Sequence, residues 1–144
     1  MNLRTSALTI STGNRLQSYI SQFLQSRYDI GSVEWRMLVV LSETPDLRMN
    51  QITELTDMDK AAVSRALTKL GEKRLAKPQV DLDNQRSKSW QLTPAGSALH
   101  DVVQAEYTRL QTEIFDGIEE SDMSKACDVL QNIRDNLDKI EMSK

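Results

Sequence analysis

Midway along the chain, the apolar side chains change from a helical spacing to a strand-like one. Helical spacing marks a short helix over about 49–55 and a second helix after the turn at 56–59, with an apolar face of Val63, Ala66, Leu67 and Leu70. Beyond it, residues 77–80 and 87–92 alternate like two short strands around a polar turn. The sequence therefore predicts two helices joined by a tight turn and followed directly by a β-hairpin.

Capping residues mark where several helices begin. Asp59 precedes the second helix of the pair, and its carboxylate suits the free amides of a first turn. Thr93 and Pro94 combine a capping hydroxyl with a proline at the first helical position. Gly31, with Glu34 three residues later, predicts the start of an earlier helix.

Longer amphipathic segments flank this central region. A first helix is predicted over about 9–27, with an apolar stripe of Leu16, Ile20, Phe23 and Leu24. The helix after Gly31 carries Trp35, Leu38, Val39 and Leu41, and residues 42–47 are predicted to form a turn. The helix from Pro94 continues for about six turns along Leu99, Val102, Val103, Leu110 and Ile114. Ser121 is predicted to cap a last helix striped by Ala126, Leu130, Ile133, Leu137 and Ile140.

The composition favours one globular domain and excludes several classes of protein. Of the 144 residues, 39% are hydrophobic and 27% are charged, as in a protein with a packed core. No apolar stretch is long enough to span a membrane and no secretory signal follows the first residues, so we expect a cytoplasmic protein. Cys127 and His100 are the only residues of their kinds, which leaves no intrachain disulfide and no Cys/His metal site. We expect no cofactor.

The charge is unevenly distributed along the chain. Residues 60–90 hold eight basic and three acidic side chains, a balance of +5, whereas the whole chain carries −3 and the remainder therefore −8. A basic segment inside an acidic protein is expected when one surface faces phosphate groups. By itself, the charge fits an ordinary solvated segment equally well.

A helix-turn-helix followed by a basic hairpin forms the parts of a winged helix-turn-helix. The segments concerned read Asp59-Lys60-x-x-Val63-Ser64-Arg65-x-x-x-x-Leu70, then Lys73-x-Leu75, then Arg86, then Leu92-Thr93-Pro94-x-Gly96. In order and spacing they resemble the MarR (multiple antibiotic resistance regulator) family over about residues 35–96. The resemblance implies a single, mainly α domain over 1–144 with a small β-hairpin wing. Residues 32–96 would form the winged helix-turn-helix lobe, flanked by N- and C-terminal dimerisation helices at 1–31 and 97–144.

The resemblance also implies a function, that of a sequence-specific DNA-binding transcriptional regulator. Such a protein would be a ligand-responsive repressor that binds a palindromic operator as a homodimer. The helix after the turn at 56–59 would enter the major groove. Arg86 at the wing tip would reach a narrow minor groove, where negative potential attracts a guanidinium. Lys60, Ser64 and Arg65 match the family's exposed recognition positions. The expected DNA-contacting residues are Lys60, Ser64, Arg65, Thr68, Lys69, Arg86 and Lys88.

Five positions depart from the family pattern. Ala61 and Ala62 replace residues that often carry hydroxyl groups, so hydroxyl contacts to DNA are not expected there. Asn84 stands where an aspartate usually braces the wing arginine, and its amide supplies no charge. Arg74 replaces a glycine at a site where left-handed backbone costs another residue about 1 kcal/mol. Pro78 cannot donate to a strand ladder and is expected at a sheet edge or an unpaired position.

The helices predicted near the two ends of the chain indicate how it could form a dimer and where it could bind a small ligand. Their apolar stripes are broader than a monomer of this size needs, which favours a homodimer over a monomeric bundle. Members of the family commonly hold a small, often anionic aromatic effector between the dimerisation helices and the DNA-binding lobe. Candidate lining residues, each of which could equally belong to the core or the surface, are Tyr19, Phe23, Trp35, Arg36 and His100.

Other classes of function are weighed against this interpretation. The sequence offers no glycine-rich phosphate loop, second histidine, Cys–His pair or aspartate cluster, so we do not expect an enzyme. Cys127 lies beside Asp128 rather than an activating base, which argues against redox sensing. The alternative that keeps the fold is a winged-helix interaction adaptor, or a small-ligand-binding protein, without DNA binding.

Overall fold

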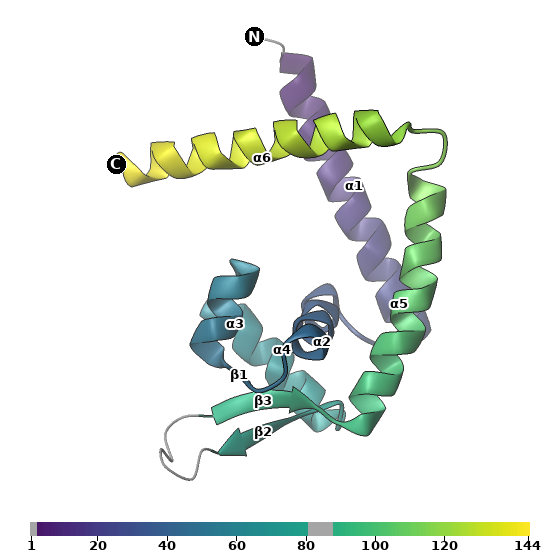
Figure 1. Cartoon of the computed structure of the whole chain (residues 1–144), viewed down its shortest axis with the longest axis vertical. Coiled ribbons are helices and arrows are strands. Elements are labelled where there is room, and N and C mark those ends of the chain that lie inside the picture. Colours follow the sequence, from purple (N-terminus) through teal and green to yellow (C-terminus); the bar gives the residue numbers. More distant parts are fainter. Residues whose placement is uncertain (1–2, 81–87) are drawn as a thin grey trace. The chain divides into compact units, whose positions relative to one another are not determined.

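The computed structural model describes residues 3–80 and 88–144 (Figure 1). Its elements, in chain order, are α1 (Leu3–Tyr28), α2 (Ser32–Glu43), β1 (Leu47–Arg48), α3 (Met49–Thr56), α4 (Lys60–Glu72), β2 (Ala76–Val80), β3 (Lys88–Leu92), α5 (Pro94–Ile114) and α6 (Glu120–Met142). Met1–Ala105 form one compact unit and Glu106–Lys144 a second one. The chain is mainly helical with a small sheet, as the sequence predicts. No helix of the described part is long and apolar enough to cross a membrane.

Within the described residues, the sheet has three antiparallel strands in the order β1-β3-β2, one strand more than the predicted hairpin. The extra strand is β1, in which Leu47 pairs with Trp90, so the expectation that Leu47 belongs to a turn was wrong. A two-residue strand is too short to show alternation, and its partner lies more than forty positions away. Pro78 lies in the edge strand β2, which confirms its expected place at a sheet edge.

The core of the first unit lies where α2, α3 and α4 pack together beside the sheet (Figure 1). The predicted face of α4 is confirmed, because Val63, Ala66, Leu67 and Leu70 are all buried. From α2, the core receives Trp35, Met37, Leu38 and Leu41. Full burial of one such leucine or valine contributes roughly 1.5–3 kcal/mol. The opposite face of α4 is therefore held outward by a well-packed inner face.

The predicted starts of three helices are confirmed by their hydrogen bonds. The Asp59 carboxylate accepts from the amides of Ala61 (2.8 Å) and Ala62 (3.3 Å) at the start of α4. The Thr93 hydroxyl accepts from the Gly96 amide (3.1 Å) at the start of α5. At α2, the Glu34 carboxylate accepts from the Gly31 amide (3.3 Å). These bonds satisfy amides that a helix leaves without intrahelical partners.

Two boundaries differ from the prediction. The first helix begins at Leu3 rather than near Thr9, so the predicted start was too late. Its first turns are exposed, although Leu3, Ala7 and Ile10 recur there at helical spacing. The last helix has Glu119 as its N-cap, and Ser121 lies inside its first turn, so the expected serine cap was wrong. Acidic side chains at Glu120 and Asp122 suit the positive end of the helix dipole.

Candidate functional site

The outer face of α4 presents five polar side chains that the sequence singled out. All are exposed: Lys60, Ser64, Arg65, Thr68 and Lys69. We call these five residues the outer face of α4. At 3.6 residues per turn, Lys60, Ser64 and Thr68 lie in one row, and Arg65 and Lys69 lie in a second row on the side of α2. The face therefore carries two adjacent rows of donors on a helix whose other side is locked into the core.

The two rows differ in chemistry. In the first, the Thr68 hydroxyl donates to the Ser64 carbonyl (2.9 Å), which leaves its oxygen free to accept. In the second, Ala61 is exposed and offers no polar group one turn before Arg65. Arg65 and Lys69 are therefore the two cations that the second row presents to an acidic partner. Because residue 61 is alanine, the row has no hydroxyl that could add a hydrogen bond to that partner.

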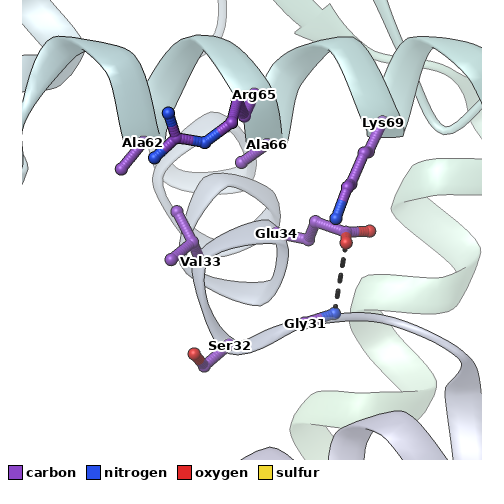
Figure 2. Close-up of a pocket in the computed structure, with 8 residues that line it drawn as sticks. All are labelled: Gly31, Ser32, Val33, Glu34, Ala62, Arg65, Ala66 and Lys69. Atoms are coloured by element: carbon purple, nitrogen blue, oxygen red, sulfur yellow. Dashed lines mark hydrogen bonds between the residues drawn. The ribbon is translucent and has the colours of Figure 1, made fainter.

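A cavity of about 240 Å³ separates the second row from the start of α2 (Figure 2). Its lining comprises Gly31, Ser32, Val33, Glu34, Ala62, Arg65, Ala66 and Lys69. Figure 2 shows Arg65 and Lys69 lying over the first turn of α2, with the Lys69 amine directed toward Glu34. Glu34 is only 5% exposed, although it is charged. The sequence had suggested Glu34 as a helix-start residue and gave no sign of its burial beneath α4.

The end of α4 is held by hydrogen bonds from the start of α5. Arg74 has φ of 59°, so the left-handed backbone expected at this non-glycine position is present. The Arg74 carbonyl accepts from the Thr93 hydroxyl (2.7 Å), and the Leu75 carbonyl accepts from the Thr93 amide (3.0 Å). A Cβ on Gly96 would lie 1.9 Å from the Leu75 carbonyl oxygen, so only glycine fits there. The Leu-Thr-Pro-x-Gly motif thus joins α5 to the end of α4.

The same junction contains an ion pair that the sequence did not predict. Lys73, the C-cap of α4, places its Nζ 2.8 Å from Glu34 Oε2 on α2 and also donates to the Asp29 carbonyl at the end of α1. The Lys73 side chain is 33% exposed and that of Glu34 7%. The sequence counted Lys73 in the basic segment, but Glu34 neutralises its charge. A separation of 39 residues hides the pair from any local pattern.

The hairpin formed by β2 and β3 carries exposed basic side chains at both ends of its described part. Lys88, a predicted contact residue, is exposed at the start of β3 and pairs with Val80 in the sheet register. Lys77 in β2 is also exposed. Arg86 and Asn84, on which the sequence-based account of the wing tip depends, lie outside the described residues.

Of the five candidate effector residues, the structure brings two together. The rings of Trp35 and His100 stack with centroids 5.5 Å apart and an interplanar angle of 19°. Phe23 instead contacts Tyr28 edge-to-face at 5.9 Å and lies under the Arg27 guanidinium. Tyr19 is 55% exposed on α1, and Arg36 is exposed on α2.

His100 borders a cavity of about 410 Å³. The cavity is lined by Leu41, Ser42, Pro45, Gln91, Leu92, Ser97, His100 and Asp101. His100 Nε2 lies 3.1 Å from the Ser42 hydroxyl, and its Nδ1 lies 3.0 Å from Asp101 Oδ1. Sequence reasoning found His100 and Trp35 but missed Ser42, Gln91 and Asp101, which come from three separate elements. Among the described residues, the lining contains one carboxylate and neither lysine nor arginine.

These features together suit the binding of an extended polyanion. The outer face of α4 is exposed and basic, and a basic hairpin follows it in the same unit. An exposed helix face that carries cations matches the width and the acceptor groups of a DNA major groove. Among the described residues, no group of three or more His, Cys, Asp and Glu side chains could hold a metal ion.

Comparison with known proteins gives independent evidence for the family to which the chain belongs. A family model described as "MarR family" matches residues 28–87. The HTH-type transcriptional regulator TcaR of Staphylococcus aureus (strain Newman) is 31% identical over 127 residues, 86% of this chain and 83% of the relative. A solved MarR/EmrR family transcriptional regulator from Acinetobacter sp. ADP1 has a TM-score of 0.83 at 26% identity, over 96% of this chain and 99% of that one. Streptococcus pneumoniae FabT, solved in complex with DNA, has a TM-score of 0.77 at 19% identity, over 95% and 97%.

Proposed function

The chain belongs to the MarR family and is a DNA-binding transcription regulator, and from this premise we propose that it binds an inverted-repeat operator as a homodimer. The observation that carries the proposal is the outer face of α4, in which exposed donors and cations stand opposite a fully buried apolar face. A helix fixed in this way places its side chains in a major groove without reordering. The FabT structure shows a chain of the same fold in complex with DNA.

The contacts divide between bases and phosphates. We assign base recognition to Arg65 and Ser64, because a guanidinium can bridge two guanine acceptors and a hydroxyl reaches either base edge. Lys60, Thr68 and Lys69 are assigned to the flanking phosphates, and Lys88 to the backbone beside the wing. Arg86, which matches the family's wing-tip arginine, is assigned to the minor groove.

The second subunit is expected to cover the exposed apolar stripes of the terminal helices. No residue of α6 is buried, and its side chains Leu130, Ile133, Leu137 and Ile140 are between 39% and 53% exposed. Such a stripe along 23 residues is typical of an obligate interface. We assign residues 1–31 and 97–144 to dimerisation and 32–96 to DNA binding. Two lobes on a two-fold axis match half-sites about one helical turn apart.

We expect Arg65→Ala to weaken operator binding by about 10- to 100-fold, the cost of removing one good base contact, without changing the fold. The side chain is exposed and its truncation leaves the buried face of α4 intact. Electrophoretic shift with the promoter DNA upstream of the chain's own gene, at fixed salt, measures the effect. Arg109→Ala on α5 is the matched control and should leave operator affinity unchanged. Equal affinities of Arg65→Ala and the unmodified protein would remove Arg65 from the recognition set.

We further propose that the protein is a cytoplasmic, ligand-responsive repressor whose small aromatic effector binds in the cavity beside His100. The His100 ring, which stacks on the buried Trp35, supplies an aromatic surface, and Ser42 and Gln91 supply hydrogen-bonding groups. Asp101 is the formal charge in the lining, so the described residues favour a cationic or neutral ring. The family resemblance implies an anionic ring in many members, and charge is therefore the property to test.

Benzamidine, benzamide and benzoate have nearly the same shape and differ in charge, so they form a matched set of probes. We expect saturable quenching of tryptophan fluorescence, with benzamidine binding most tightly, in the unmodified protein and in Trp90→Phe, which leaves Trp35 as the reporter. His100→Ala should weaken the binding of every probe that quenches. Tightest binding by benzoate would contradict the charge assignment, and the absence of quenching by all three would contradict the site.

A further inference from the structure

The three residues that follow α4 tie the recognition helix to two separate parts of the chain. From one side, Lys73 donates to the Asp29 carbonyl at the end of α1 and to Glu34 in the first turn of α2. From the other side, Thr93 at the start of α5 donates hydrogen bonds to the carbonyls of Arg74 and Leu75. The end of α4 is thereby fixed to both helices that continue toward the terminal regions of the chain.

The acceptors around Lys73 are themselves held in place. Asp29 has a left-handed backbone with φ of 54°. Its backbone amide donates to the Gln25 backbone carbonyl (3.2 Å), and its carboxylate accepts from the Gln25 side-chain amide (2.7 Å). Glu34 is buried, with Oε1 accepting from the Gly31 amide and Oε2 bound to Lys73. The ammonium group therefore meets two oriented acceptors from two different elements.

Small rotations at this point have large effects at the other end of the helix. α4 has 13 residues, which corresponds to about 20 Å at 1.5 Å per residue. A tilt of about 10° about Lys73 would displace Lys60 by about 3 Å and the base-reading Arg65, about 12 Å from Lys73, by about 2 Å, most of the length of a hydrogen bond. Base-edge recognition does not survive such a displacement, whereas attraction to phosphates depends far less on position.

Resting on the proposed DNA-binding function, we propose that Lys73 and Glu34 are positioning residues that set the orientation of α4 for operator recognition, and that Lys73 is not a phosphate ligand. The Lys73 ammonium is committed to Glu34 and to the Asp29 carbonyl, and the carboxylate cancels its charge. Removal of the pair lowers the preference for operator over nonspecific DNA and leaves the number of displaced counterions unchanged.

The test uses the double variant Glu34→Gln with Lys73→Met, which removes both charges together and leaves no buried carboxylate unpaired. Binding to operator and to a scrambled duplex is measured in the full-length protein at several salt concentrations. We expect operator affinity to fall about tenfold, comparable to the effect of removing one base contact, with nonspecific affinity and the salt slope unchanged. Lys60→Met, the matched control on the same helix, should lower both affinities together and reduce the slope.

Several results would overturn the proposal. A reduced salt slope in the double variant would make Lys73 a phosphate ligand. An unchanged operator preference with a lowered urea midpoint would make the pair merely structural. Lys73→Arg keeps donors for both acceptors and should retain operator preference, so a loss in that variant also contradicts the mechanism. If the unmodified protein shows no operator binding, the proposed function itself fails and this inference with it. Normal binding by the unmodified protein and the double variant alike defeats the inference alone.

Discussion

Replacing Gly96 with alanine is expected to lower the free energy of unfolding by about 3 kcal/mol, the upper range for overpacking a closed site. The added Cβ would lie 1.9 Å from the Leu75 carbonyl oxygen and 2.9 Å from its carbonyl carbon. Neither atom belongs to a flexible side chain, and the Thr93 amide holds the carbonyl in position at 3.0 Å. The start of α5 would have to move away from the end of α4. Urea unfolding at fixed protein concentration measures the loss, because the stability of a dimer depends on concentration.

Gly71→Ala is the matched control for this prediction. Gly71 belongs to α4, in the same unit, and a Cβ there would meet the nearest atom, on the Trp90 ring, at an ordinary 3.8 Å. Alanine favours a helix over glycine by up to about 1 kcal/mol, so this variant should be as stable as the unmodified protein or slightly more so. Similar free energies for Gly96→Ala and Gly71→Ala would show that the junction between α4 and α5 adapts without cost.

Operator affinity is expected to fall about a thousandfold between 50 and 200 mM salt, which corresponds to about six phosphate contacts in the dimer. The estimate counts the three exposed cations that are assigned to phosphates in each subunit: Lys60, Lys69 and Lys88. Lys73 is excluded because Glu34 neutralises it. Binding isotherms at four or more salt concentrations give the slope directly. A nearly flat salt response would rule out phosphate-dominated binding and favour an adaptor that binds another protein.

Two separate variants, each of which removes one positive charge, show which residues cause the salt dependence of operator binding. Lys88→Gln removes one cation from each wing and should lower the slope by about two in the dimer, one for each subunit. Lys125→Gln, an exposed position on α6, removes the same charge far along the chain and should leave the slope unchanged. Equal slopes for both variants would place the phosphate contacts outside the wing.

Local sequence patterns predicted the parts of the fold that depend on local physics. The inner face of α4 follows from apolar spacing over two turns, and the caps Asp59 and Thr93 follow from hydrogen bonds within three residues. The left-handed backbone of Arg74 was expected from the family resemblance, because members usually have a glycine at that point. In each case the deciding interaction lies within one element or beside it.

Features that depend on distant partners were not predictable in this way. β1 exists because Leu47 and Arg48 pair with Trp90 and Ser89 of β3, and two residues carry no period of their own. The pairing of Lys73 with Glu34 likewise requires α2 to be packed beneath α4. Neither residue type signals such a partner, since a lysine in a basic segment is most simply interpreted as a solvated cation or a DNA contact.

The proline in β2 has a consequence for the protein when it is not bound to DNA. An exposed edge strand offers unpaired amides and carbonyls to any other chain, which is a common route to aggregation. Pro78 removes one amide from the middle of that edge, and the exposed Lys77 beside it adds a charge that repels a second copy of the same strand. While the regulator is not bound to DNA, Pro78 and Lys77 thus hinder another strand from pairing with the edge of its sheet. Replacing Pro78 with a residue that has a backbone amide would make the unbound regulator more prone to aggregate.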